Sequence, residues 1–117
     1  MLRTSAVGQN ASPLRVGHVF EIRFPAFTPR ITIHSERELT VEIVAGENRG
    51  FSDRVEYEAV VIRDGLVVLS WREHIGSTIV SVLDFASGHA YTAVTPAKGE
   101  FMRLSGPIDV KSATPPH

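Results

Sequence analysis

The sequence predicts an all-β protein, a single small up-and-down antiparallel barrel of about eight strands. Short segments with polar–apolar alternation or many β-branched residues follow one another through residues 16–108, and Gly, Pro, Asn or Asp separates them. No stretch keeps a helical period of 3.6 residues for three turns. Connections this short favour a meander, and closing it into a barrel leaves no long unpaired edge. A two-sheet sandwich is the alternative, but sandwiches usually need longer crossovers.

Eight strands are expected in chain order. Asp64-Gly65 separates the fourth from the fifth, and this dipeptide predicts a tight hairpin because glycine readily adopts the positive φ of a primed turn. The polar segment 46–50 predicts a flexible loop after the third strand. Residues 1–15 and 109–117 are predicted to be flexible tails outside the barrel domain, residues 16–108. The expected strands are His18–Phe24, Arg30–Ser35, Glu38–Ala45, Arg54–Arg63, Leu66–His74, Ser77–Phe85, His89–Thr95 and Glu100–Ser105.

Composition excludes several classes of protein. The 117 residues suit one compact domain. Twelve basic and thirteen acidic residues leave a net charge of −1, which argues against nucleic-acid binding. The absence of cysteine rules out disulfides, a thiol nucleophile and Cys-based metal sites. No secretory signal and no apolar run of the roughly 20 residues that span a bilayer are present, so we expect a cytoplasmic protein without a membrane role.

Alternation assigns side chains to the interior, because neighbouring residues of a strand point to opposite faces. For residues 77–85 it gives no decision, since one face would hold Thr78, Val80, Val82 and Asp84 and the other Ile79, Ser81, Leu83 and Phe85. In the other strands the residues expected to share an inward face are His18, Phe20, Ile22 and Phe24; Leu39, Val41 and Ile43; Val55, Tyr57, Ala59 and Val61; and Val67, Leu69 and Trp71.

Glu73 is the most informative polar residue, because it is in phase with Trp71 on an apolar face. A buried carboxylate is costly unless it is paired, and burial raises its pKa, which is typical of residues that handle a ligand. The alternative is that Trp71 plugs a filled barrel and Glu73 lies at the rim in water, paired with Arg103.

These residues define a candidate cavity for a small hydrophobic or aromatic molecule. Tyr57, Trp71 and Tyr91 would form its aromatic walls, and Glu73, Asp84 and Arg103 would orient the ligand. For the two tyrosines, a half-buried place in a strand with the hydroxyl at the rim is an equal alternative. If the protein is an enzyme, general acid–base catalysis by Glu73 or Asp84 is the chemistry that the residues support.

Other motifs are missing. The five histidines are scattered, and no two have the i, i+2 or i, i+4 spacing of a metal site on one element. No Gly-x-Ser-x-Gly motif and no phosphate-binding glycine-rich loop occurs. We therefore expect neither a metal nor a cofactor.

The segment from residue 57 to 106 resembles the MoaF-like family, which is related to molybdenum-cofactor biosynthesis protein F and placed among the lipocalin-like, calycin-type barrels. The resemblance rests on an ordered set of motifs, and it could extend over residues 16–107. It implies a small barrel with an internal pocket near Trp71, Glu73 and Asp84, and no particular activity. The motifs are Leu69-Ser70-Trp71-Arg72-Glu73, Gly76-Ser77-Thr78-Ile79-Val80, Asp84, Tyr91, Gly99-Glu100-Phe101 and Gly106.

Three functions follow from these observations. The first is a barrel, expected as a homodimer, that binds a small apolar or aromatic molecule in an internal cavity. The second is an isomerase, cyclase or lyase on the same scaffold, with Glu73 as general acid or base. The third is a filled barrel that acts as an interaction module through an exposed strand or loop.

Overall fold

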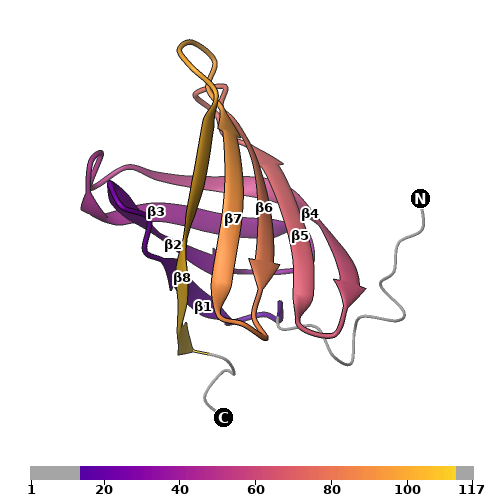
Figure 1. Ribbon diagram of the computed structural model, residues 1–117. Coiled ribbons are helices and arrows are strands. Elements are labelled where there is room, and N and C mark those ends of the chain that lie inside the picture. Colours follow the sequence, from indigo (N-terminus) through magenta and orange to yellow (C-terminus); the bar gives the residue numbers. More distant parts are fainter. Residues whose placement is uncertain (1–13, 113–117) are drawn as a thin grey trace.

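The chain folds into a closed antiparallel barrel of eight strands in which each strand pairs with its sequence neighbours and β1 pairs with β8 (Figure 1). The computed structural model describes residues 14–112. This architecture confirms the predicted fold class, and no helix in the described residues could cross a membrane. The strands are β1 (Val19–Ile22), β2 (Phe27–Ile33), β3 (Glu38–Gly46), β4 (Ser52–Arg63), β5 (Leu66–Arg72), β6 (Thr78–Asp84), β7 (His89–Thr95) and β8 (Met102–Ser112).

Two strands are shared between the halves of the barrel. The first part of β4 pairs with β3 up to Glu56, and the second part pairs with β5 from Tyr57 onward. In the same way β8 pairs with β7 over 102–107 and with β1 over 108–112. One half, sheet A, therefore contains β1, β2, β3, the first part of β4 (52–56) and the last part of β8 (108–112). The other half, sheet B, contains β5, β6, β7, the last part of β4 and the first part of β8. The strands of sheet B run across those of sheet A (Figure 1).

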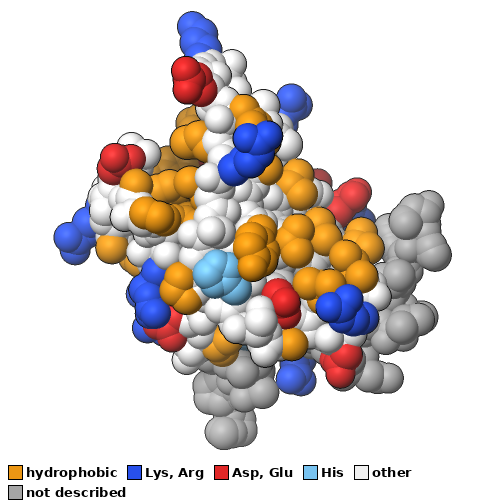
Figure 2. All heavy atoms as spheres, viewed as in Figure 1, with side chains coloured by type: hydrophobic (Ala, Val, Ile, Leu, Met, Phe, Trp, Pro, Cys, Tyr) orange, Lys and Arg blue, Asp and Glu red, His pale blue; other side chains and the backbone are white. Residues whose placement is uncertain are grey.

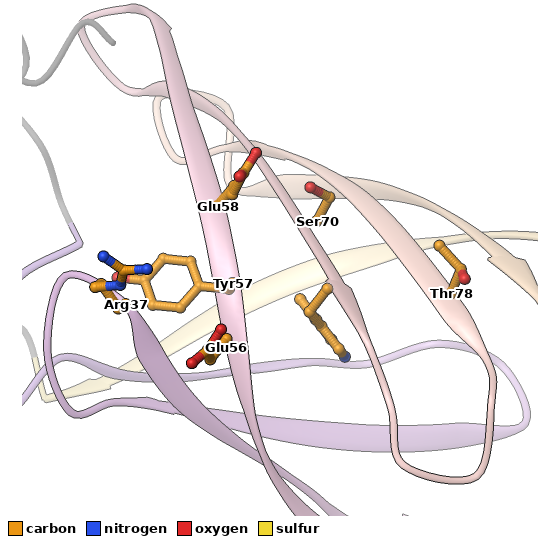
Figure 3. Close-up of a pocket in the computed structure, with 7 residues that line it drawn as sticks. Arg37, Glu56, Tyr57, Glu58, Ser70 and Thr78 are labelled. Carbon is orange, nitrogen blue, oxygen red and sulfur yellow. The ribbon is translucent and has the colours of Figure 1, made fainter.

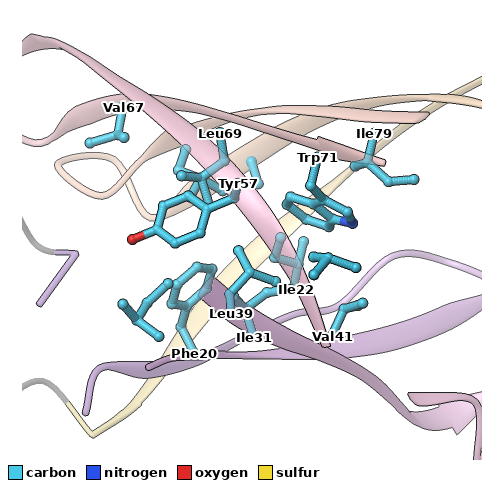
Figure 4. Packing of buried hydrophobic residues seen from close by; sticks show 14 of the residues in the cluster. Phe20, Ile22, Ile31, Leu39, Val41, Tyr57, Val67, Leu69, Trp71 and Ile79 are labelled. Atoms are coloured by element: carbon cyan, nitrogen blue, oxygen red, sulfur yellow. The ribbon is translucent and has the colours of Figure 1, made fainter. Parts of the chain in front are cut away.

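Apolar side chains from both sheets fill the barrel (Figure 4). Phe20, Leu39, Val67 and Leu83 are fully buried, and Tyr57 and Trp71 are exposed by only 7% and 8%. Except for Ala59 and Val61, which are partly buried, the side chains that alternation assigned to the interior are buried. Burying this much apolar surface is the main stabilising term of such a fold.

The sequence pattern did not decide which face of β6 points inward. In the structure, Ile79, Ser81 and Leu83 do. Ser81 lies inside because its hydroxyl bonds the hydroxyl of Thr92 on β7 at 2.6 Å, which satisfies both buried groups.

Two glycines allow backbones to approach closely. Gly106 on β8 has no room for a Cβ, because the carbonyl oxygen of Arg23 occupies that space. Gly46 at the end of β3 has φ +83°, and the backbone of Ala26 and Phe27 occupies the space beside it. Only glycine fits such a close contact without a shift of the backbone.

The predicted tails need a correction at the C-terminal side. Residues 109–112 were expected to be a flexible tail, but they form the end of β8 and pair with β1. The pairing of Val19 and Phe20 with Ser112 and Val110 explains this, because closing the barrel requires a partner for the short strand β1. The predicted N-terminal tail falls largely on residues 1–13, which lie outside the described residues.

Candidate functional site

Tyr57 and Trp71 lie side by side across β4 and β5, but their polar groups point toward opposite ends of the barrel (Figure 4). The Tyr57 hydroxyl donates to the carbonyl oxygen of Ser35 in the β2–β3 turn at 2.8 Å. The Trp71 indole Nε1 donates to Oε2 of Glu73 at 3.2 Å. Burial raises the pKa of Tyr57 to about 12, and the charge of Glu36 adds to this. Tyr57 is therefore a neutral hydrogen-bond donor that holds the β2–β3 turn at one end of the barrel. The indole N–H of Trp71 points to the opposite end, where it bonds Glu73.

Glu73 follows β5 directly and is half-buried, between the buried and the rim positions that the sequence left open. Burial raises the pKa of its carboxyl group above the usual value, and the nearby charge of Asp53 raises it further. The hydrogen bond from Trp71 opposes both effects. Its backbone N–H donates to Ser77 O and its carbonyl accepts from Gly76 N–H, both at 2.8 Å, so the β5–β6 turn holds its main chain.

Asp53 on β4 is a site residue that was missed in the sequence. Its side chain is only 13% exposed, and Oδ2 accepts the backbone N–H of His74 at 2.8 Å. The second oxygen, Oδ1, lies 2.7 Å from Nδ1 of the His74 ring. Asp53 is two residues before the inward-facing Val55, so extending the expected strand by one residue would have placed it inside.

The two carboxyl groups have opposite pKa shifts. Burial alone would raise the pKa of Asp53, but the backbone and side-chain bonds from His74 outweigh it and the pKa lies below its usual value. The Glu73 pKa lies above its usual value. When the pKa values of two neighbouring carboxyl groups are driven apart, one group can stay ionised while the other carries a proton. We call Asp53, Trp71, Glu73 and His74 the carboxylate end of the barrel.

Three of the residues predicted to line the cavity lie on the outside of the barrel instead. Tyr91 is 54% exposed, because β7 turns Ala90 and Thr92 inward instead. Asp84 ends β6 on the outer face, where Oδ1 accepts the N–H of Ser87 at 3.1 Å. Those bonds to Ser87 lower the pKa of Asp84. Arg103 is exposed and lies over the ring of Phe101, 5.0 Å from its centroid. Neither Asp84 nor Arg103 pairs with Glu73 among the interactions of the described residues.

Two surface hollows adjoin the carboxylate end. The first, about 320 Å³, reaches Trp71 and is otherwise lined mainly by outward polar side chains of β4, β5 and β6 (Figure 3). This hollow is open to solvent, and neither Glu73 nor Asp53 is among its lining residues. The second, about 510 Å³, includes His74. The lining residues are Arg37, Glu56, Tyr57, Glu58, Ser70, Trp71 and Thr78 for the first, and Glu38, Arg54, Val55, Glu56, Arg72 and His74 for the second.

The acidic groups of this end do not form a metal centre. Among residues 14–112, no three His, Asp or Glu side chains are grouped closely enough to hold a metal ion. What the arrangement offers is hydrogen-bond acceptance and proton exchange beside an aromatic wall.

Comparison with known proteins identifies a family and solved structures of similar fold. The family model described as MoaF-like matches residues 16–109, which confirms the resemblance seen in the motifs. A crystal structure from Burkholderia vietnamiensis, described as a "putative beta-lactamase", superposes with a TM-score of 0.78 at 28% sequence identity. The match covers 82% of this chain and 94% of that one. No curated protein matches the sequence.

Proposed function

This chain belongs to the MoaF-like family, and we propose that it binds a small organic molecule at the carboxylate end of the barrel. The observation that carries the proposal is the half-buried Glu73 carboxylate, which accepts the Trp71 indole N–H at 3.2 Å and lies near the partly buried Asp53. A carboxyl group in apolar surroundings, with a neighbour that the main chain holds in place, is typical of sites that orient a ligand.

The chemistry of this end favours ligands that donate hydrogen bonds. The sequence had suggested Arg103 as a cationic anchor, but Arg103 lies on the outside of the barrel. The polar groups that remain are the carboxylates of Glu73 and Asp53, with the apolar face of Trp71 beside them. A phenol, alcohol or amine on an aromatic or terpenoid body satisfies these acceptors, whereas a carboxylic acid is repelled.

Titration of the fluorescence of Trp71, the single tryptophan of the chain, tests the proposal. The panel contains aromatic, polyketide-like and terpenoid compounds in matched pairs that differ only in an amine or hydroxyl against a carboxylate. We expect saturable quenching by the donor of a pair and a weaker effect of the acid. Glu73→Gln should weaken binding of the donors, and Asp84→Asn, at the opposite end of β6, should leave it unchanged. Identical titrations for wild type and Glu73→Gln would remove Glu73 from the site.

Catalysis at the same end is the second candidate, and the opposite pKa shifts of Glu73 and Asp53 favour it. Glu73 would act as the general acid or base of an isomerase, cyclase or lyase, with Asp53 kept ionised by His74. This function predicts turnover that disappears in Glu73→Gln while ligand affinity survives. Unchanged turnover in that variant excludes Glu73 from the mechanism.

The name of the structural relative does not supply a mechanism for this chain. Serine β-lactamases use a Ser-x-x-Lys motif, in which the serine is the nucleophile. Here the two lysines, Lys98 and Lys111, follow Thr95 and Ile108 at that spacing. Hydrolysis of a β-lactam by that mechanism therefore forms no part of the proposal.

A further inference from the structure

The outer face of sheet B carries an apolar patch that no other part of the described chain covers. We define the outer patch by the outward residues Val60, Val68, Val80, Val82 and Tyr91. Three of them, Val60, Val80 and Tyr91, are between 41% and 54% exposed. Figure 2 shows hydrophobic side chains gathered over the strands of sheet B, with charged side chains around them. Contiguous apolar surface with a polar rim marks an interaction site.

Strand register arranges this patch in rows across the sheet. One row runs from Val60 through Val68 and Val82 to Tyr91, each directly opposite the next on the neighbouring strand. The adjoining row begins at Glu58 on β4, crosses Ser70, Val80 and Ala93, and ends at Arg103 on β8. The second row thus has opposite charges at its two ends and an apolar centre on β6.

The two charges at the ends of this row are not used within the chain. Neither Glu58 nor Arg103 forms an ion pair with a described residue. Arg103 rests on the exposed ring of Phe101. Both side chains are exposed at the margins of sheet B, where they can reach a second molecule.

We propose that the outer patch binds a second copy of this chain, with β6 of one copy packed on β6 of the other. A two-fold axis inclined by about 15° to β6, half of the ~30° at which packed sheets cross, places β5 over β7 and β4 over β8 of the partner. Val80 then meets its own counterpart, Val68 lies against Tyr91, and Glu58 faces Arg103. The symmetry repeats the Glu58–Arg103 pair on both sides, so the face is complementary to itself. This inference does not depend on the proposed ligand.

The size of the patch predicts a weak dimer. Five strands spaced about 4.8 Å apart and three to four rows of outward residues make a face of roughly 20 × 20 Å, which is below the ~800 Å² per partner of a standard stable interface. Asp84 is on the same outward face of β6 as Val80 and lies about 13 Å further along the strand, at 3.3 Å per residue. Because packed sheets cross at about 30°, the two β6 strands diverge away from Val80, and the two Asp84 carboxylates are displaced from each other.

A charge-swap cycle tests the proposal. Sedimentation velocity of the full chain, from about 1 to 500 µM to bracket a dissociation constant in the micromolar range, should show a monomer–dimer equilibrium. Glu58→Arg and Arg103→Glu should each weaken the dimer about tenfold or more, because each places like charges opposite each other. The double variant should restore most of the wild-type affinity. Glu47→Arg, in the β3–β4 loop, is the control for net charge and should have no effect.

A second pair of variants tests the apolar centre. Val80→Lys should abolish the dimer, whereas Ile75→Lys, at a more exposed apolar position in the β5–β6 turn, should leave it intact. Circular dichroism establishes that each variant is folded. A wild-type chain that stays monomeric at every concentration overturns the proposal. So does a dimer that Val80→Lys leaves unchanged, or a double charge swap that fails to recover affinity.

Discussion

Asp53 and His74 are joined by two contacts, one from the backbone N–H of His74 to Oδ2 at 2.8 Å and one between Nδ1 and Oδ1 at 2.7 Å. The first residue is on β4 and the second is in the β5–β6 turn, so the pair links the two sheets at the carboxylate end. The same turn carries Glu73, which means that Asp53 helps to hold the main chain of the residue that it also influences electrostatically.

Replacing Asp53 should destabilise the fold and loosen this turn. Hydrogen bonds to a charged group contribute about 1.5–3 kcal/mol, and the exposure of His74 places this pair at or below the lower end, so we expect Asp53→Ala to cost about 1–2 kcal/mol. His74→Ala removes only the ring contact and should cost less. Urea unfolding of both variants at pH 7 measures the difference. Equal stability of Asp53→Ala and wild type would contradict the role assigned to this pair.

Acid should weaken the same pair. The pKa of folded Asp53 lies below its ordinary value of 3.8, so the ionised carboxylate stabilises the fold above that pH. This contribution is lost as the pH falls from 3.8 through the lower folded pKa. The difference in unfolding free energy between wild type and Asp53→Ala should therefore shrink in that range. A difference that stays constant down to pH 2.5, well below the ordinary value of 3.8, would refute this linkage.

Glu73→Gln should have the opposite effect on stability. Burial raises the folded pKa of Glu73 above its ordinary value of 4.5, so the ionised form is less favourable in the folded protein than in the unfolded chain. That penalty is absent below pH 4.5 and develops as the pH rises through the folded pKa. Glutamine still accepts the Trp71 N–H, so Glu73→Gln should unfold at higher urea concentration than wild type at pH 8. Its advantage should disappear at pH 4, and a variant less stable than wild type at pH 8 would be inconsistent with this account.

Tyr57→Phe tests whether the hydrogen bond at one end of the barrel affects ligand binding at the carboxylate end. The Tyr57 hydroxyl bonds only the β2–β3 turn, so we expect a loss of about 0.5–1.5 kcal/mol in unfolding free energy. The carboxylate end should keep its ligand affinity and its Trp71 emission, since the hydroxyl points away from them. Trp71 titrations of Tyr57→Phe serve as the measurement, and loss of binding at full folding would place Tyr57 in the site after all.

Gly106→Ala should disturb the closure of the barrel. The added methyl group meets the carbonyl oxygen of Arg23, and because this is backbone the strands must separate, which should cost about 2 kcal/mol or more. Gly50→Ala is the control, because Gly50 has φ +100° and open space around it. Gly50→Ala should lower the unfolding free energy only by the cost of holding alanine in the left-handed region, about 1–2 kcal/mol. Thermal unfolding that ranks Gly50→Ala as the more damaging change would argue against this closure contact.

Much of this barrel could be predicted from local patterns. The period-two alternation of Val55, Tyr57, Leu69 and Trp71 predicts their burial, because a strand places every second side chain on one face. The phase of Trp71 likewise predicts that Glu73 lies beside it at the edge of the core. The hairpin at Asp64-Gly65 could be predicted because glycine readily adopts the positive φ of a tight turn, and Gly65 has φ +81°.

What only the tertiary structure decided depends on contacts between distant segments. Tyr91 and Arg103 are outside because the register of β7 and β8 turns Thr92 and Leu104 inward, and alternation alone does not choose between adjacent residues. The inward face of β6 is chosen by the hydroxyl pair between Ser81 and Thr92. The sequence by itself determined an eight-stranded meander with a carboxylate next to a tryptophan. The contacts of Asp53 with His74 and Glu73 depend on how far β4 continues past its pairing with β5 and on the path of the β5–β6 turn, which the sequence pattern did not define.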